Sequence, residues 1–258
     1  PTPAHRLGVS MRAILSDVHG NIEALDAVLA DIGRLPVSSV YSLGDIIGYG
    51  PNPIECLNRA RAWDLNVLGN HDHAVLFDPT GFSPTAEKAA LWTRALIEGA
   101  RRDDLWTFLS ERPRQFREGH FLFVHGSARN QTNEYVFPED VYNVTKMNKI
   151  GEHIERYCFA GHTHVPGVFL EPEPGAQWQF LSPEEIDHTW RLDERKTIVN
   201  VGSVGQPRDA NPRACYVTLD GLDLTFRRVE YDVDATAKKI YAIPELNDFL
   251  GDRLRDGR

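Results

Sequence analysis

Five short segments of the chain each place possible metal ligands directly after an apolar run, with a glycine beside them. In chain order they read SDVHGN, LGDIIGYG, VLGNHDH, FVHGS and FAGHTH. Together they supply Asp17, His19, Asp45, Asn70, His125, His162 and His164. This mixture of imidazole, carboxylate and amide ligands favours Mn, Fe, Zn or related ions over calcium. Because a tetrahedral zinc takes only four ligands, the set predicts two ions that share one carboxylate.

A pair of such ions would carry out phosphoryl chemistry. Two ions about 3.5–4 Å apart can clamp a phosphate and activate a shared hydroxide for in-line attack. His71 directly follows Asn70, and it is left free to face the substrate rather than the metals. The segments therefore predict a metal-dependent hydrolase of phosphoric esters.

Each segment has a simpler explanation when it is taken alone. An isolated Asp-x-His is usually a loop, and an isolated Gly-Asp is usually a turn. Their repetition at five predicted strand ends makes the combination specific. A closed structural metal site is a competing interpretation, but it would need fewer ligands. A second competing interpretation is a binding scaffold that retains its metals but catalyses no reaction.

The elements that must position these residues alternate strand and helix through the first seventy positions. Strands are predicted over residues 12–16, 40–43 and 65–68. Apolar residues recur at helical spacing over 22–32, and Pro51 and Pro53 open a second helix that reaches about residue 63. This order predicts a parallel sheet with right-handed crossovers. The carboxyl ends of its strands would then meet at the edge where ligands bind.

The remaining pattern is interpreted as part of the same domain, residues 11–258. Further strands are predicted over 120–124, 157–160, 197–201, 215–219 and 222–229. Further helices are predicted within 85–110, where there are two, over 138–153, and in a C-terminal tail over 233–258 that is interrupted at Pro244. Residues 168–192 are expected to form a hairpin insertion. Residues 1–10 are expected to be a disordered leader or a cloning remnant, with Met11 a candidate start.

Taken in order, the motifs resemble those of the calcineurin-like metallophosphoesterase superfamily, in its small prokaryotic phosphodiesterase and phosphatase branch. The family pattern is D-x-H, G-D, G-N-H-[DE], H and G-H-x-H, and every part is present between Asp17 and His164. A later stretch, NVGSVGQPRD over 200–209, is similar to small prokaryotic members and extends the likeness to about 12–219. The resemblance implies an α/β fold, a four-layer α/β/β/α sandwich of two mixed β-sheets.

The resemblance also implies which residue does what. One metal would be held by Asp17, His19 and His164, the other by Asn70, His125 and His162, and Asp45 would bridge them. The cofactors would be two divalent or mixed-valence transition-metal ions, of Mn, Fe, Zn or Ni. His71 would stabilise the charged transition state or protonate the leaving oxygen, and Asp72 would orient it. Arg208 could contact a phosphate, or with equal weight form a structural ion pair.

By the same resemblance, the activity is expected to be that of a phosphodiesterase. It would act on a small nucleotide-type or other phosphate ester through a metal-bridging hydroxide. The alternatives are a phosphomonoesterase, including a protein or small-molecule phosphatase, and a non-catalytic metal-bound binding scaffold. Aromatic residues of the hairpin insertion, Trp178, Phe180 and Trp190, could stack on a base, although such residues more often pack a hairpin.

Composition limits the partners and the compartment that we expect. The chain is 41% hydrophobic and 25% charged, as in soluble globular proteins. A net charge of −9 disfavours a stable nucleic-acid complex, so the expected partner is a small phosphorylated substrate. No apolar run approaches the roughly 18 residues of a membrane span, and no signal peptide is evident. Three cysteines far apart in the sequence suggest no disulfide framework, which favours a cytoplasmic location.

Overall fold

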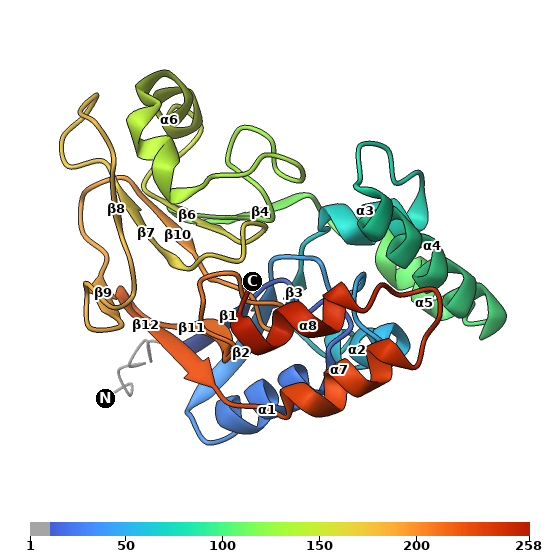
Figure 1. Cartoon of the computed structure of the whole chain (residues 1–258). Coiled ribbons are helices and arrows are strands. Elements are labelled where there is room, and N and C mark those ends of the chain that lie inside the picture. The colour runs from blue at the N-terminus through green and yellow to red at the C-terminus, as the bar shows by residue number, and fades with distance from the viewer. Residues whose placement is uncertain (1–10) are drawn as a thin grey trace, which may run out of the picture.

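Two mixed six-stranded sheets form the centre of the protein in a computed structural model that describes residues 11–258 (Figure 1). The expectation for residues 1–10 lies outside the described part. The first sheet has the order β3-β2-β1-β11-β12-β9, and the second has the order β4-β5-β6-β10-β7-β8. The strands are β1 (Met11–Leu15), β2 (Val37–Ser42), β3 (Leu65–Asn66), β4 (Gln115–Glu118), β5 (Phe121–Val124), β6 (Tyr157–Ala160), β7 (Gly167–Leu170), β8 (Gln179–Leu181), β9 (Thr189–Arg191), β10 (Thr197–Asn200), β11 (Ala214–Asp220) and β12 (Asp223–Val229). The helices are α1 (Ile22–Ile32), α2 (Pro53–Ala60), α3 (Asn70–Leu76), α4 (Pro84–Gly99), α5 (Asp103–Ser110), the 3-10 helix η1 (Pro138–Tyr142), α6 (Val144–Gly151), α7 (Val233–Tyr241) and α8 (Phe249–Asp256).

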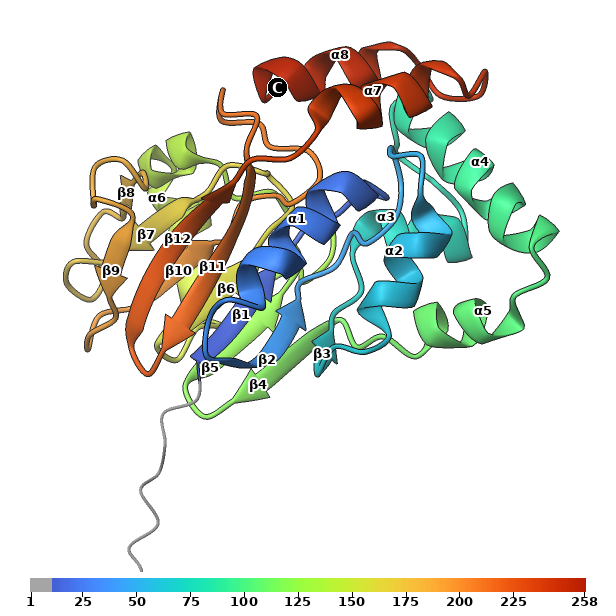
Figure 2. The same ribbon diagram turned by 90° about the horizontal axis from the view of Figure 1, so that it is seen from below.

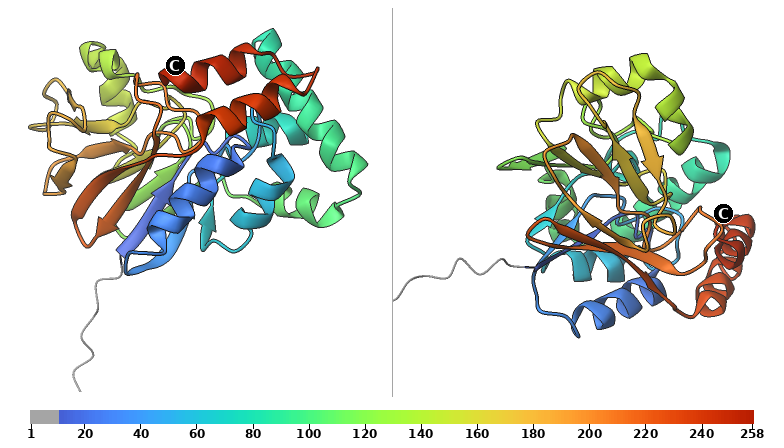
Figure 3. Two further views of the ribbon diagram at one scale, coloured as in Figure 1. Left: turned by 60° about the horizontal axis from the view of Figure 1, so that its bottom comes forward. Right: turned by 90° about the vertical axis from the view of Figure 1, so that its left-hand side faces the viewer.

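Both faces of each sheet are buried, which produces four layers. Successive residues of β1 enter different cores: Ala13 packs toward α1 and α2, and Ile14 packs between the two sheets. In β6, Phe159 lies between the sheets and Cys158 packs toward α6. This alternation follows from the two-residue period of a strand. The right-hand view of Figure 3 shows α6 covering one sheet and α1 covering the other. The expected four-layer sandwich of two mixed sheets is confirmed.

The parallel parts of the two sheets carry the loops of interest. Strands β1, β2 and β3 are parallel neighbours in the first sheet, and β5, β6 and β10 are parallel neighbours in the second. In the first sheet the carboxyl ends are in register, because Leu15 pairs with Ser42 and Ser42 pairs with Asn66. The chain therefore leaves these strands at one edge, as the sequence predicted.

Several elements differ from the sequence prediction. Strand β4 has the polar sequence QFRE, which lacks an apolar alternation, and it forms as the antiparallel edge partner of β5. The helix predicted over 138–153 is divided into η1 and α6 at Asn143, whose side chain caps α6 by accepting a hydrogen bond from Lys146 N. Helix α3 was not predicted, because NHDHAVL has too few apolar residues to show a helical period.

The segment over 168–192 divides between the two sheets. Strands β7 and β8 pair as an antiparallel hairpin. Strand β9 instead crosses to the first sheet and pairs with β12.

The C-terminal helices lie beside the loops of the first sheet. Leu250 and Leu254 of α8 and Ile240 of α7 pack with Ala89 of α4, and Figure 2 shows both helices spanning from α1 to α4. Tyr49, in the loop after β2, packs against this cluster. No helix within residues 11–258 combines the length and apolar composition that a membrane-spanning segment needs.

Candidate metal centre

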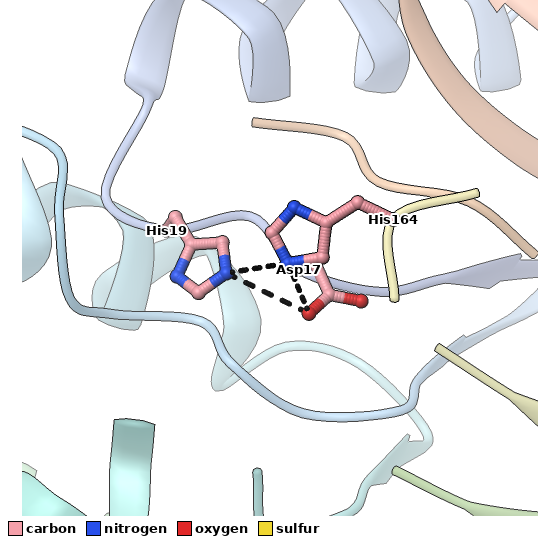
Figure 4. Close-up of side chains that lie close together, drawn as sticks. All are labelled: Asp17, His19 and His164. Carbon is pink, nitrogen blue, oxygen red and sulfur yellow. Dashed lines mark hydrogen bonds and ion pairs between the residues drawn. The ribbon is translucent and has the colours of Figure 1, made fainter. Parts of the chain in front are cut away.

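Two groups of buried side chains meet where the five predicted segments converge. The ligand atoms of Asp17, His19 and His164 lie within 4.8 Å of one another (Figure 4), and those of Asp45, His125 and His162 do the same. Asn70 joins the second group, with its Oδ1 2.9 Å from His125 Nε2. The structure thus brings together all seven residues that the sequence singled out as possible ligands.

Asp45 lies between the two groups. Its Oδ1 accepts a hydrogen bond of 2.8 Å from the backbone N–H of His71. Its Oδ2 is 3.3 Å from His125 Nε2 in one group and 3.7 Å from His19 Nε2 in the other. One carboxylate oxygen is therefore available to both groups at once.

The four imidazoles are oriented so that their lone pairs face the centre. His19 Nδ1 lies 3.3 Å from the carbonyl oxygen of Ile47, and His125 Nδ1 lies 2.9 Å from that of Leu43. His164 Nδ1 lies 2.6 Å from Gln206 O, and His162 Nε2 lies 3.4 Å from Asn133 O. A carbonyl oxygen only accepts, so each of these outer nitrogens carries a proton, and the inner nitrogen of each ring is the one left for a metal. The inner nitrogens are then acceptors, which is how ligating histidines are held in metal sites.

These acceptors face one another with no donor between them. His19 Nε2 is 3.1 Å from His164 Nε2, and His125 Nε2 is 3.1 Å from His162 Nδ1. Asp17 Oδ1 is buried and accepts no hydrogen bond within the described residues. Buried acceptors left without a donor are costly, and a cation in each group would satisfy them. The residues therefore fit a pair of metal ions.

Burial and neighbouring charges shift the pKa values of Asp17 and His162 toward their metal-binding forms and the pKa of His125 away from it. Burial would raise the pKa of the Asp17 carboxyl, but His164 beside it holds that pKa well below its ordinary value. Burial, followed by repulsion from His125, lowers the pKa of His162 to about 3. Asp45 outweighs the effect of burial on His125 and raises its pKa to about 9. A cation would therefore have to displace a proton from His125 Nε2.

Backbone strain is concentrated at this centre. Six of its residues have φ between 50° and 69°: Asp17, His19, Asp45, Tyr49, His162 and His164. This left-handed region costs a residue other than glycine roughly 1–2 kcal/mol. Backbone hydrogen bonds hold it, including Asp17 N to Gly44 O at 3.0 Å and His19 N to Asp45 O at 2.9 Å. Such strain persists where the surrounding structure imposes it, typically at functional sites.

Asp72 differs from its expected position. No hydrogen bond joins its carboxylate to the His71 ring within residues 11–258. It accepts instead from the backbone N–H groups of Asp45, Ile46, Ile47 and Gly69, at 2.9 to 3.3 Å. Its carboxylate therefore fixes the loop that carries Asp45, and it acts on His71 only through that loop.

The stretch over 200–209 holds the first group in place. Asn200 Nδ2 donates to Gly161 O at 2.7 Å and to Thr163 Oγ1 at 2.8 Å. Ser203 Oγ donates to Asp17 O at 2.8 Å. The loops that carry Asp17 and His164 are thereby tied together, which gives this sequence motif a structural explanation.

His71 lies beside the metal groups with an unused nitrogen. Its ring is surrounded by those of Tyr49, Phe82 and His19 at centroid distances of 4.3, 4.7 and 4.9 Å. Its Nδ1 is buried with no hydrogen-bond partner in the described part of the chain. A third set of possible ligands combines His71 with His19 and Asp45. Since both of those belong to the first two groups, His71 borders the pair rather than forming another site.

The same neighbourhood contains aromatic residues that the sequence analysis missed. Tyr49 contacts His19 and His71, and Tyr135 stacks on His162. The sequence carried one usable signal for Tyr49, because glycines flank it in the loop after Asp45. Tyr135 had no signal beyond following His125 in the same loop.

Arg208 and Asp209 differ in whether their charges are paired within the protein. Asp209 forms a largely buried ion pair with Arg228. No carboxylate lies within ion-pair distance of Arg208 in residues 11–258. Its guanidinium carbon lies 5.9 Å from the centroid of the Tyr49 ring, and its Nη2 donates to Gln206 Oε1 at 2.7 Å. The structural ion pair that the sequence analysis considered therefore belongs to Asp209, and the charge of Arg208 stays available.

Replacing Gly69 by alanine is expected to remove metal binding. A Cβ atom there would lie 2.0 Å from Asp45 Oδ1 and 2.2 Å from Asp45 N, so the bridging carboxylate would have to move. Overpacking of this kind costs about 1–3 kcal/mol of the free energy of unfolding. The matched control is Gly99→Ala, where nothing lies within 4 Å of the new Cβ. Metal analysis and thermal unfolding of both variants test this, and wild-type metal content in Gly69→Ala would refute it.

Comparisons with known proteins agree with this geometry. Residues 11–222 match the calcineurin-like phosphoesterase superfamily domain. An uncharacterised protein of Methanocaldococcus jannaschii is 35% identical over 96% of this chain and 99% of its own length. A crystal structure of a metallophosphoesterase from Sphaerobacter thermophilus is similar with a TM-score of 0.83 and 34% identity, covering 96% of this chain and 99% of that one. A symmetrical bis(5'-nucleosyl)-tetraphosphatase of Methylococcus capsulatus is 35% identical over 70% of this chain and 68% of that protein.

Proposed function

The chain belongs to the calcineurin-like phosphoesterase superfamily and is a phosphoesterase, and on this basis we propose that it hydrolyses small nucleotide-type phosphate diesters at a two-metal centre. The observation that carries the proposal is the pair of buried ligand groups with Asp45 Oδ2 between them.

We assign the ligands as follows. Asp17, His19 and His164 would hold one ion, Asn70, His125 and His162 would hold the other, and Asp45 is placed to serve both. The donor set suits Mn, Fe, Zn or Ni. When bound, such ions neutralise the charge of a phosphate and provide a nucleophile from water at neutral pH.

Two further side chains act on the substrate itself. His71 borders the centre, and its ring lies beside that of the ligand His19, so it can donate a hydrogen bond or a proton to the oxygen that leaves. Arg208 has no carboxylate partner in the described residues, and guanidinium groups pair well with phosphate oxygens. We therefore propose His71 as the catalytic group and Arg208 as a phosphate contact.

The nucleotide part of the proposal has separate support. The Methylococcus capsulatus relative is named for action on bis(5'-nucleosyl) tetraphosphates. Because 35% of the aligned residues are identical over 70% of this chain, we infer a related substrate. Such a substrate contains two nucleosides joined through phosphates.

A substrate panel tests the proposal. Phosphomonoesters, linear diesters, cyclic nucleotides and dinucleoside polyphosphates are each supplied with the metal-loaded protein, using Mn, Zn, Fe or Ni in turn. We expect hydrolysis of nucleotide diesters to exceed that of monoesters. EDTA should abolish turnover and added metal should restore it. Preference for monoesters would refute the diester assignment, and no hydrolysis of any ester would refute the activity.

The Arg208→Ala variant is expected to raise KM about 10- to 100-fold, because a hydrogen bond to a charged group contributes about 1.5–3 kcal/mol. Arg208→Lys should recover part of this affinity. Arg213, an exposed arginine in the same loop, provides the control variant Arg213→Ala. Steady-state kinetics give the KM of each variant, and an unchanged KM in Arg208→Ala would exclude a phosphate contact.

A further inference from the structure

Two parallel aromatic rings lead outward from the second ligand group. The Tyr135 ring lies over the imidazole of His162 with a centroid distance of 3.7 Å and an interplanar angle of 17°. The Phe137 ring stacks on Tyr135 at 5.2 Å and 7°. His162 is 4% exposed, whereas Tyr135 is 40% exposed and Phe137 is 37% exposed. The rings thus connect the buried centre to solvent.

Hydrogen bonds and an ion pair fix the loop that carries these rings. Gly126 N donates to Gln131 O at 2.7 Å, and Arg129 forms an ion pair with Glu134. Lys146 Nζ donates to the carbonyl oxygen of Tyr135 at 2.8 Å, and Phe137 N donates to Asp140 Oδ2 at 2.7 Å. A fixed loop loses little conformational entropy when a ligand binds, so the rings are preorganised.

Trp178 of the hairpin insertion is 1% exposed and packs in the core on the α6 side of the second sheet. It therefore packs the hairpin, as such residues more often do, and it offers no ring for a base. Tyr135 and Phe137 are both partly exposed, and Tyr135 stacks directly on His162 of the ligand group.

The stack of rings begins at the centre itself, because Tyr135 lies directly on His162. A phosphate held at the centre would therefore leave its ester substituent within reach of these rings. A planar substituent gains most from such a surface, since every nucleobase can stack on an aromatic side chain.

Because Tyr135 is stacked between His162 and Phe137, the face open to a ligand is the outer face of Phe137. We propose that this face, with Tyr135 stacked behind it, forms a stacking platform for the base of the nucleotide-type substrate. This inference rests on the proposed function and adds the part of the substrate that the protein recognises outside the metal centre. The platform selects esters with a planar aromatic group next to the sugar over purely aliphatic esters.

The test compares two ligands that differ only in the base. The dissociation constants of AMP and ribose 5-phosphate are measured by calorimetry with the Mn-loaded protein. Stacking on one base should give AMP an advantage of about ten- to a hundred-fold. In Tyr135→Leu and Phe137→Leu this ratio should fall toward one, while ribose 5-phosphate serves as the internal reference for the phosphate site.

Tyr142→Leu is the matched control. Tyr142 is 79% exposed and lies at the end of η1, so its removal should leave the AMP preference as in the wild type. Phe137 stacks on Tyr135 rather than on His162. The Phe137→Leu variant should therefore leave the metal ligands in place, so that a change in its AMP preference reports on the platform alone. Equal affinity of the wild type for both ligands would overturn the platform, as would a preference that survives in both platform variants or is lost equally in Tyr142→Leu.

The two proposals fail separately. If esters are hydrolysed but AMP has no advantage, the platform is wrong and the phosphoesterase proposal stands. If no ester is hydrolysed, the binding ratio still reports on the platform.

Discussion

Replacing His71 by asparagine is expected to lower kcat about 10²- to 10⁴-fold while the protein keeps its full complement of metal. That range is what a positioned proton donor or acceptor contributes. The ring lies beside the two ligand groups, next to His19 and Asp45. Loss of the ring should therefore remove an interaction with the reacting group and leave the metal ligands in place.

The control for His71 lies two residues further along the same helix. His73 is half-buried, and its ring contacts Phe77 rather than the centre. His73→Asn should retain nearly wild-type kcat. If His71→Asn instead loses metal, His71 is a ligand, as its proximity to His19 and Asp45 would then require. An unchanged kcat with full metal content would remove His71 from the reaction.

The substitution Asp45→Asn is expected to have the larger effect on metal binding. Asp45 Oδ2 is the only carboxylate oxygen described here that lies within 4 Å of a histidine nitrogen from each group. An amide keeps the size of the side chain but removes the negative charge that would hold two cations close together. We expect metal content to fall below two ions per chain and activity to fall by about 10³-fold or more, since electrostatic stabilisation is usually the largest catalytic term.

Asp31 supplies the comparison for Asp45. It accepts hydrogen bonds from Tyr216 and Arg227 on the outer side of the first sheet, away from the ligand groups. Asp31→Asn should reduce thermal stability and leave metal content and kcat as in the wild type. Two ions per chain in Asp45→Asn, measured by elemental analysis, would contradict a shared carboxylate.

The convergence of the ligands could be predicted because its causes are local in the sequence. An apolar strand, a glycine and a polar side chain occur together at Asp17, Asp45 and His125, and parallel strands bring their carboxyl ends to one edge. The presence of two sheets was not predictable from periodicity, since strands buried on both faces show no alternation of apolar and polar residues. That part of the prediction depended on the family resemblance.

Other features depend on contacts between distant segments. Asp72 fixes the loop over 45–47 through backbone hydrogen bonds, which no spacing in the sequence reveals. Tyr135 becomes part of the centre only because the chain after His125 folds back over His162. Trp178 was considered for base stacking on its residue type alone, and its burial in the core on the α6 side shows the packing role that such residues more often have. Residue types at strand ends were therefore informative, whereas aromatic residues in loops were not.

Crystallography with anomalous scattering gives the most direct test of the central claim, which is that two cations share Asp45. Crystals equilibrated with Mn²⁺ should show two anomalous peaks within coordination distance of Asp45, one also contacting His19 and His164 and the other also contacting His125 and His162. A single peak, or peaks that leave Asp45 uncoordinated, would contradict the account.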